Sequence, residues 1–168
     1  DQRNFREAEQ WLGKIDDAAG ALSVQLRRAS LLAKQGRLND GRELIRKVPE
    51  RGPQDSRSKL LAESQLLRDV RQWPEAYRVL GQANERFPDD VDLIYEQAMM
   101  AEKMRRPDEM ERLLRRVIQL KPDHFHAYNA LGYTLADRNT RLEEGRRLGG
   151  KALRLAPGTE LTVVDSGC

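Results

Sequence analysis

Four prolines at nearly equal intervals are the feature that most constrains the fold of this 168-residue chain. Pro53, Pro88, Pro122 and Pro157 are separated by 35, 34 and 35 residues, and each follows a helical pattern. Because proline cannot continue an α-helix, it marks a regular stopping point. Repetition at this interval predicts a chain of similar supersecondary units rather than one irregular globule.

Small and apolar residues recur in register with these prolines. Three columns keep intervals of 33, 35, 34 and 35 residues. Their members are Ala8, Gly41, Ala76, Met110 and Gly145 in the first column, Leu12, Ile45, Leu80, Leu114 and Gly149 in the second, and Ile15, Val48, Ala83, Val117 and Ala152 in the third. Two helical patterns fit between successive prolines, so each unit is predicted to be a helix pair. Stacked helix pairs of this period are typical of a solenoid.

The segment 123–157 shows the unit most clearly. Tyr128, Leu131, Gly132 and Leu135 lie at offsets of three, four and seven residues and form one apolar stripe of a helix. Gly132 leaves room in that stripe for the close approach of another helix. A polar break at 137–140 precedes a second helical pattern, which predicts two packed helices.

The motif Tyr128-x-x-Leu131-Gly132, together with the small residues, apolar residues and prolines at this period, resembles the tetratricopeptide repeat of bacterial proteins. The second repeat fits the same pattern through Trp73, Ala76, Leu80, Ala83 and Pro88. The resemblance implies an all-α, right-handed superhelical solenoid of antiparallel helix pairs. It divides the single array 1–168 into the second helix of a truncated repeat at 4–17, full repeats at 21–53, 54–88, 89–122 and 123–157, and the start of a truncated further helix at 158–168.

Several positions depart from the usual pattern of this repeat. Pro107 stands where an aromatic residue is common, and Gly41 and Gly145 stand where alanine is common. Arg105 replaces the glycine expected at the turn between two helices, so we expect a turn that is less sharply left-handed than the one at Gly36. Three glycines within 141–154 each cost the helix about 1 kcal/mol relative to alanine. That helix is predicted to fray most easily.

The charge balance argues against a nucleic-acid partner. The chain has 30 basic and 27 acidic residues, interleaved along the predicted helices, and a net charge of +3. The most basic segments, 105–121 and 141–154, contain neither aromatic stackers nor a recognition motif. We therefore expect a solvated surface with local ion pairs. Nucleic-acid binding through these arginine-rich second helices remains a third, less favoured hypothesis.

The sequence offers little support for a disulfide, a membrane span or a catalytic centre. The only cysteine is Cys168, and no apolar run is long enough for membrane insertion. The segment 145–152 nearly matches a phosphate-binding loop, but Ala152 replaces the hydroxyl that would bind magnesium and no strand precedes the segment. His124 and His126 are two residues apart and are expected to point in different directions in a helix, so no metal site is predicted. We expect no cofactor and no enzymatic activity.

The resemblance also implies a binding surface. In this family the first helices line a concave groove, and the positions between the packing residues contact the ligand. The corresponding positions here are Ser23, Leu26, Ser30, Ala33, Ser58, Leu61, Gln65, Arg68, Asp92, Tyr95, Met99, Glu102, His126, Asn129, Tyr133 and Asp137. Tyr95, Met99, Asn129 and Tyr133 are the most ligand-like of these, because they combine amphipathic rings, an amide and an adaptable thioether. The alternative is that Tyr95 and Tyr133 pack between helices.

These observations predict a non-catalytic scaffold that binds a peptide or partner protein in the groove. Leu26 and Ser30 occupy positions where some family members clamp a C-terminal carboxylate with Lys and Asn, so that type of recognition is not expected. The alternative function is a self-assembling array that associates through the exposed ends of the solenoid or its convex basic helices. The segment 117–144 resembles bacterial envelope-associated repeat proteins, which favours a periplasmic or envelope location over the cytoplasm.

Overall fold

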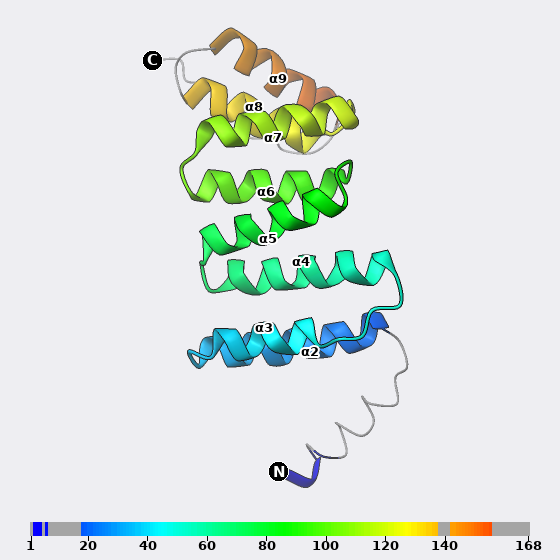
Figure 1. The fold of residues 1–168 in the computed structure, drawn as a ribbon. Coiled ribbons are helices and arrows are strands. Elements are labelled where there is room, and N and C mark those ends of the chain that lie inside the picture. Colours follow the sequence, from blue (N-terminus) through cyan, green and yellow to red (C-terminus); the bar gives the residue numbers. More distant parts are fainter. Residues whose placement is uncertain (1, 5, 7–17, 138–141, 156–168) are drawn as a thin grey trace. The chain divides into compact units, whose positions relative to one another are not determined.

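In a computed structural model of the chain, residues 2–4, 6, 18–137 and 142–155 are described, and the regular elements among them are all α-helices (Figure 1). The helices are α2 (Ala18–Lys34), α3 (Leu38–Arg46), α4 (Pro53–Asp69), α5 (Trp73–Arg86), α6 (Val91–Lys103), α7 (Pro107–Leu120), α8 (Phe125–Asp137) and α9 (Leu142–Leu155). The predicted all-α class is confirmed over these residues. The segment predicted as a helix at 4–17 lies almost wholly outside the described residues, and 158–168 lies entirely outside them.

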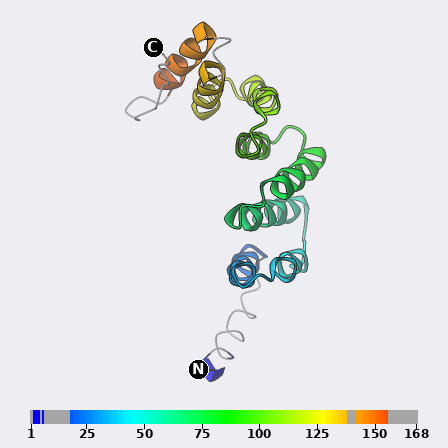
Figure 2. The same ribbon diagram turned by 90° about the vertical axis from the view of Figure 1, so that its left-hand side faces the viewer.

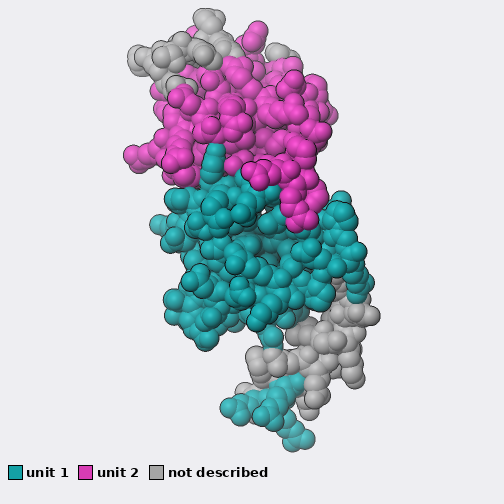
Figure 3. Space-filling view, viewed as in Figure 1, with its two compact units in different colours: residues 1–83 teal, residues 84–168 magenta. Residues whose placement is uncertain are grey.

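The chain divides into two compact units, residues 1–83 and 84–168, which are described separately (Figure 3). In the first unit, α2 and α3 form an antiparallel pair and lie side by side when viewed end-on (Figure 2). The core between this pair and α4 contains Ala29, Ala33, Ile45, Ala62 and Leu66, with Leu22, Leu26, Leu38 and Val70 packed against it.

The second unit contains the pairs α6–α7 and α8–α9, and α7 also packs on α8. Fully or almost fully buried side chains join these helices, among them Leu93, Ala98, Met100, Leu114, Val117, Leu131 and Leu135. Removing such side chains from water is the main favourable contribution to packing. We propose that α2–α3, α4–α5, α6–α7 and α8–α9 are the four full repeats predicted from the sequence.

The three sequence columns mark the buried faces of the second helices. Every column member among the described residues is buried: Gly41, Ala76, Met110 and Gly145; Ile45, Leu80, Leu114 and Gly149; Val48, Ala83, Val117 and Ala152. Gly41 lies so close to α2 that a Cβ at this position would be 2.8 Å from the carbonyl oxygen of Ala29. Glycine therefore replaces the usual alanine where two backbones touch.

Three described turns, between α2 and α3, α4 and α5, and α6 and α7, share one left-handed geometry, which corrects the expectation for Arg105. Its φ is 55°, close to the 58° of Arg71, and Gly36 has φ 81°. In each turn the following amide donates to a carbonyl five residues back: Arg37 to Leu32 at 2.8 Å, Gln72 to Leu67 at 2.8 Å and Arg106 to Ala101 at 2.9 Å. This hydrogen bond closes the helix end only if the preceding residue is left-handed. The hydrogen bond that closes the helix end therefore outweighs the tendency of arginine to avoid a left-handed backbone conformation.

The position of Pro53 differs from the sequence expectation. Pro53 is the first residue of α4 instead of the end of the preceding unit, and α3 ends at Arg46. Proline suits the first helical position because its missing N–H would have no helical partner there. Pro107 begins α7 for the same reason. The segment 145–152 lies inside α9, so it forms helix and not a phosphate-binding loop.

Candidate partner-binding site

The predicted binding residues fall into two sets, one in each unit. Leu61, Gln65 and Arg68 occupy one face of α4 in the first unit, where Gln65 is exposed and the other two are half-buried. In the second unit, α6 carries Tyr95, Met99 and Glu102, and α8 carries His126, Asn129, Tyr133 and Asp137. The second set is the larger one and is drawn from two helices.

The beginnings of α6 and α8 meet through a group of rings that we call the ring cluster: Tyr95, His124, Phe125 and His126. The Tyr95 ring centroid lies 5.1 Å from that of His124 and 6.4 Å from that of His126. The rings of Phe125 and His126 are 4.0 Å apart. The structure therefore brings together Tyr95 and His126, which the sequence placed on two separate repeats.

His124 belongs to the ring cluster but was not among the predicted binding residues. It precedes α8, and its Nδ1 accepts a hydrogen bond from the Ala127 amide at 3.0 Å. The expectation that the two histidines point apart assumed that both were helical, and it was wrong because His124 caps the helix. The two imidazole centroids are 6.2 Å apart. In the sequence, the position of His124 just before the first residue of α8 could have indicated a helix cap, although histidine is not among the preferred capping residues.

Burial changes the acid–base properties of this cluster. Desolvation lowers the pKa of His124, with the nearby Lys121 and His126 acting in the same direction. Desolvation also raises the pKa of the Tyr95 hydroxyl, and the carboxylates of Glu96 and Glu102 add to the effect. Both shifts favour the neutral side chain. The rings of His124 and Tyr95 are therefore neutral at neutral pH.

The ends of α6 and α8 border a cavity of about 390 Å³, which we call the α6–α8 cavity. It is lined by Glu102, Arg105, Arg106, Pro107, Met110, Tyr133, Thr134 and Asp137. The buried Thr134 hydroxyl donates to the Ala130 carbonyl at 2.8 Å and lies 3.2 Å from the Met110 sulfur. Three of the predicted binding residues, Glu102, Tyr133 and Asp137, thus share one cavity.

The two tyrosines differ in their surroundings. Tyr133 is 51% exposed, so it does not pack between helices, whereas Tyr95 is half-buried against His124. Met99 and Asn129 are also half-buried. The Asn129 Oδ1 is enclosed and has no hydrogen-bond partner among the described residues. Packing therefore accounts for part of the Tyr95 surface but not for the exposed Tyr133 ring.

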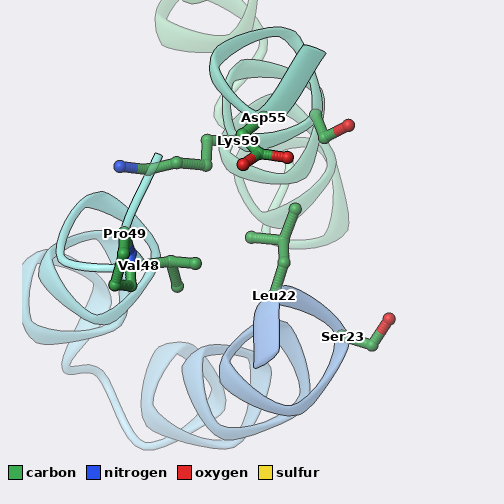
Figure 4. Close-up of a pocket in the computed structure, with 7 residues that line it drawn as sticks. Leu22, Ser23, Val48, Pro49, Asp55 and Lys59 are labelled. Atoms are coloured by element: carbon green, nitrogen blue, oxygen red, sulfur yellow. The ribbon is translucent and has the colours of Figure 1, made fainter. Parts of the chain in front are cut away.

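A smaller cavity of about 210 Å³ lies in the first unit, between the start of α2, the segment after α3 and the start of α4 (Figure 4). Leu22 and Val48 point into it. Its charged groups already have partners: Lys59 Nζ donates to the Arg46 carbonyl at 2.6 Å, and Asp55 accepts from the Arg51 amide at 2.7 Å. Ser23 and Ser58, two of the predicted groove positions, line this cavity, whereas Leu61, Gln65 and Arg68 do not. Because its charged groups are already paired, it is the weaker candidate.

The exposed arginines of α7 form local ion pairs, as the sequence predicted. Arg112 pairs with Glu109 at 2.8 Å, Arg115 with Glu111 at 3.3 Å and Arg116 with Asp89 at 2.9 Å. A phosphate backbone would have to compete with these carboxylates. The basic helix is thus partly neutralised.

The described residues contain neither a metal-ligand cluster nor a helix that could span a membrane. No group of three or more histidine, cysteine or acidic side chains among these residues could hold a metal ion. Within the same residues, none of the helices combines the length and the apolar character that crossing a bilayer requires.

Stacked antiparallel helix pairs with a repeating buried face define a helical-repeat protein. The sequence is 34% identical over 166 residues to the TPR repeat-containing protein PA4667 of Pseudomonas aeruginosa. This match covers 99% of the chain, which spans about 28% of that relative's length. No family model matches the sequence.

Solved structures support the fold. A crystal structure of MamA aligns with a TM-score of 0.62 at 17% identity, over 80% of this chain and 77% of that chain. A structure of MamA from Desulfovibrio magneticus RS-1 aligns with a TM-score of 0.63 at 17% identity, over 92% of this chain and 89% of that chain. The sequence match and the fold together confirm the resemblance to tetratricopeptide repeat proteins that the sequence predicted.

Proposed function

We propose that this chain is a non-catalytic scaffold that binds an extended or helical segment of another protein on one surface of its second unit. We call this surface the α6–α8 face, and its residues are Tyr95, Met99, Glu102, His126, Asn129, Tyr133 and Asp137. One observation supports it most: residues predicted on two separate repeats converge. Tyr95 and His126 meet near the starts of the two helices, while Glu102 and Asp137 border one cavity at their ends. The helices therefore run parallel along the face.

The chemistry of the α6–α8 face suits a peptide. The positions from Tyr95 to Glu102 span about 10 Å of helix at 1.5 Å per residue, enough to contact a few residues of an extended chain. Tyr133 and His126 provide exposed rings, and Met99 provides an adaptable apolar surface. The unpaired oxygen of Asn129 would accept a backbone N–H of the bound segment after a small rotation of its amide. We propose Leu61, Gln65 and Arg68 as a second contact surface in the first unit.

Site-specific photo-cross-linking tests this proposal. Peptides would be selected from a random phage-displayed library on the immobilised chain. The photoreactive residue p-benzoylphenylalanine would replace Tyr133, and, as a matched control in the same unit, the exposed Gln119 of α7. We expect the selected peptides to cross-link at position 133 and not at 119. Equal or stronger cross-linking at 119 would contradict the assignment of the face.

A binding measurement gives a second readout for the same face. Replacing Tyr95, Met99, Asn129 and Tyr133 together by alanine is expected to weaken peptide binding at least about tenfold, since buried and half-buried anchors carry most of the binding energy. Fluorescence anisotropy would measure the affinity, and far-UV circular dichroism would show whether the helices are retained. Unchanged affinity in a variant that keeps its helicity would refute the proposed site.

Self-association is the competing function. Leu31, which is 61% exposed on α2, is a large apolar side chain that favours it. A single exposed leucine is common on monomeric proteins and is not a docking patch by itself, so we favour partner binding. Light scattering over a range of concentrations would separate the two functions. We expect the measured mass to stay at the monomer value at every concentration. Self-assembly would be favoured if the mass rose with concentration in the wild type but stayed at the monomer value in Leu31→Ser.

A further inference from the structure

We infer that the ring cluster makes partner binding on the α6–α8 face sensitive to pH: protonation of His124 turns its ring out of the cluster and weakens binding of the segment. This inference rests on the proposed function, because it concerns the regulation of the same face. It follows from two features of the geometry. The imidazole of His124 caps α8, and the same ring packs on Tyr95, one of the proposed contact residues.

The ring cluster holds both histidines of the chain, His124 and His126. Their imidazole centroids are 6.2 Å apart. Histidine is the side chain whose ordinary charge change falls between about pH 5 and pH 8, whereas carboxyl and lysine side chains ordinarily titrate outside this range. Mild acidification is therefore expected to change side-chain charge mainly at this cluster.

The bond between the His124 ring and α8 requires a neutral imidazole. The Ala127 amide donates to the Nδ1 of His124 at 3.0 Å and shares its proton with the His124 carbonyl at 3.1 Å. Nδ1 accepts only while it carries no proton, so protonation places an N–H donor against the amide N–H. The imidazolium would also lie at the positive end of α8. Both effects favour turning the protonated ring away from the helix.

The backbone before α8 is held by bonds that do not involve the imidazole. The Tyr128 hydroxyl donates to the Pro122 carbonyl at 2.7 Å, and the His124 amide donates to the Lys121 carbonyl at 3.1 Å. The His124 carbonyl continues to accept the Ala127 amide when the ring leaves. Protonation is therefore expected to move one side chain and not to unfold the helix pair.

Movement of the His124 ring changes the surroundings of Tyr95. The two ring centroids are 5.1 Å apart and the ring planes are tilted by 41°. Tyr95 also lies 6.4 Å from His126, a second residue of the α6–α8 face. Aromatic pairs at such distances hold each other in preferred orientations. When the His124 ring leaves, Tyr95 loses a neighbour that orients it, so the face no longer presents the arrangement that binds the segment.

The groups around His124 set the direction of the pH effect. Burial lowers the pKa of His124, and Lys121 and His126 act in the same direction, while the backbone hydrogen bond and Asp92 at the start of α6 oppose them. Tyr95 also faces the ring from α6, and burial raises the pKa of its hydroxyl, so it keeps its proton. The neutral ring is therefore complete above about pH 6.5 and is lost as the pH falls below that value through the lower pKa of the folded state.

Peptide affinity measured as a function of pH tests the inference. A phage-selected peptide without histidine would be labelled with a fluorophore and titrated with the whole chain at about pH 7.5, 6.5 and 5.5. We expect the Kd to rise by about twofold to tenfold over this range, because one competing proton lowers affinity by at most about tenfold per pH unit. In His124→Asn, which keeps a capping acceptor but does not titrate, the rise should be much smaller. A constant Kd in the wild type, or an equal rise in His124→Asn, would overturn the inference.

The second histidine provides a matched control. His126→Asn removes the other imidazole of the cluster and leaves the bond between Ala127 and the His124 ring in place. Whatever its affinity at pH 7.5, this variant should still lose affinity as the pH falls. If the pH dependence disappears in His126→Asn and persists in His124→Asn, the inference is wrong.

Amide-resolved NMR of the chain without peptide gives a readout that does not depend on affinity. The Ala127 amide should shift between about pH 7.5 and pH 5.5 in the wild type, because it loses the imidazole acceptor, and should shift little in His124→Asn. Far-UV circular dichroism at both pH values should show unchanged helicity. An Ala127 amide that does not respond to pH in the wild type, or a loss of helicity over this range, would contradict the movement of a single ring.

Failure of the inference and failure of the proposed function give different results. If selected peptides cross-link at position 133 and bind equally well at about pH 7.5 and pH 5.5, the inference about His124 fails and the α6–α8 face stands. If the peptides do not cross-link at position 133, the proposed face fails and the inference fails with it.

Discussion

Gly132 of α8 and Gly145 of α9 bring the backbones of the two helices into direct contact. A Cβ at position 132 would lie 2.7 Å from the carbonyl oxygen of Gly145, and one at 145 would lie 2.8 Å from the carbonyl oxygen of Gly132. Distances this short leave no space for a methyl group. Gly145, one of the three glycines that weaken α9 as an isolated helix, is therefore required where α9 packs on α8.

Alanine at either position should destabilise the second unit. We expect Gly132→Ala or Gly145→Ala to lower the free energy of unfolding by about 1–3 kcal/mol, because overpacking outweighs the roughly 1 kcal/mol gain in helix propensity. Gly52→Ala is the matched control, since a Cβ at Gly52 meets nothing within 4 Å. Its effect should stay within about 0.5 kcal/mol. Urea unfolding followed by circular dichroism measures all three, and a stabilised Gly145→Ala variant would contradict the packing account.

A buried carboxylate links helices α3, α4 and α5 in the first unit. The Glu63 side chain is 7% exposed and accepts hydrogen bonds from Arg42 Nε at 2.8 Å and Arg46 Nη2 at 2.7 Å. Arg42, 11% exposed, also pairs with Glu75 at 3.3 Å. The network therefore ties together three consecutive helices.

Removing the charge of Glu63 should be costly because it leaves the largely buried Arg42 short of a partner. We expect Glu63→Gln to lower the free energy of unfolding by about 3 kcal/mol. The control is Asp40→Asn, which breaks the exposed pair with Arg37. An exposed pair contributes less than about 1 kcal/mol. Chemical denaturation compares the two variants, and similar small losses for both would show that the network contributes little.

The left-handed turns offer a stabilising substitution. Arg71 has φ 58°, a conformation that costs a non-glycine residue about 1–2 kcal/mol. Arg71→Gly removes this cost but adds freedom to the unfolded chain, so we expect a net gain of about 0.5–1 kcal/mol. Gly36→Ala, with φ 81° in the native turn, should cause a loss of similar size. Thermal unfolding of the Arg71→Gly and Gly36→Ala variants would test this. A loss of stability in Arg71→Gly would show that the left-handed backbone of Arg71 is not strained.

The His124 cap predicts a pH dependence. Because burial lowers the pKa of His124 below its ordinary value of 6.5, the unfolded chain binds the proton more readily than the folded one. The stabilising contribution is therefore complete above about pH 6.5, and it is lost as the pH falls below that value through the lower pKa of the folded state. Lys121 and His126 reinforce the effect, while Asp92 and the backbone hydrogen bond oppose it.

His124→Asn tests this dependence because asparagine keeps a capping acceptor but does not titrate. We expect the midpoint of urea unfolding to fall between about pH 7.5 and pH 5.5 in the wild type, and to fall less in the variant. An equal fall in both proteins would assign the pH dependence to other groups.

Periodicity predicted the fold because burial repeats with the helix pair. The columns containing Ile45, Leu80 and Leu114 identified the buried side of each second helix, and Gly132 indicated close packing. The intrinsic backbone preference of a single residue predicted its conformation less reliably. The sequence did not reveal that Arg105 is left-handed, because the hydrogen bonds of the turn decide its conformation and are set by the whole helix pair.

The candidate site was predictable only in part. The family pattern placed Tyr95 and His126 at separate groove positions, and their contact depends on how α6 and α8 pack. His124 was not predicted as a site residue, because a residue before a helix has no fixed direction until its capping bond is known. The cavity could not be anticipated either, since Arg106 and Thr134 come from a turn and a buried helix face with no shared sequence motif.

The most direct test of the central claim is the map of amide chemical-shift changes when a selected peptide is added to the labelled chain. The account predicts that the largest changes fall on the α6–α8 face, at Tyr95, Met99, His126 and Tyr133, and that exposed positions of α7 such as Arg112 and Gln119 change little. Changes concentrated on α7, with the α6–α8 face unaffected, would contradict it.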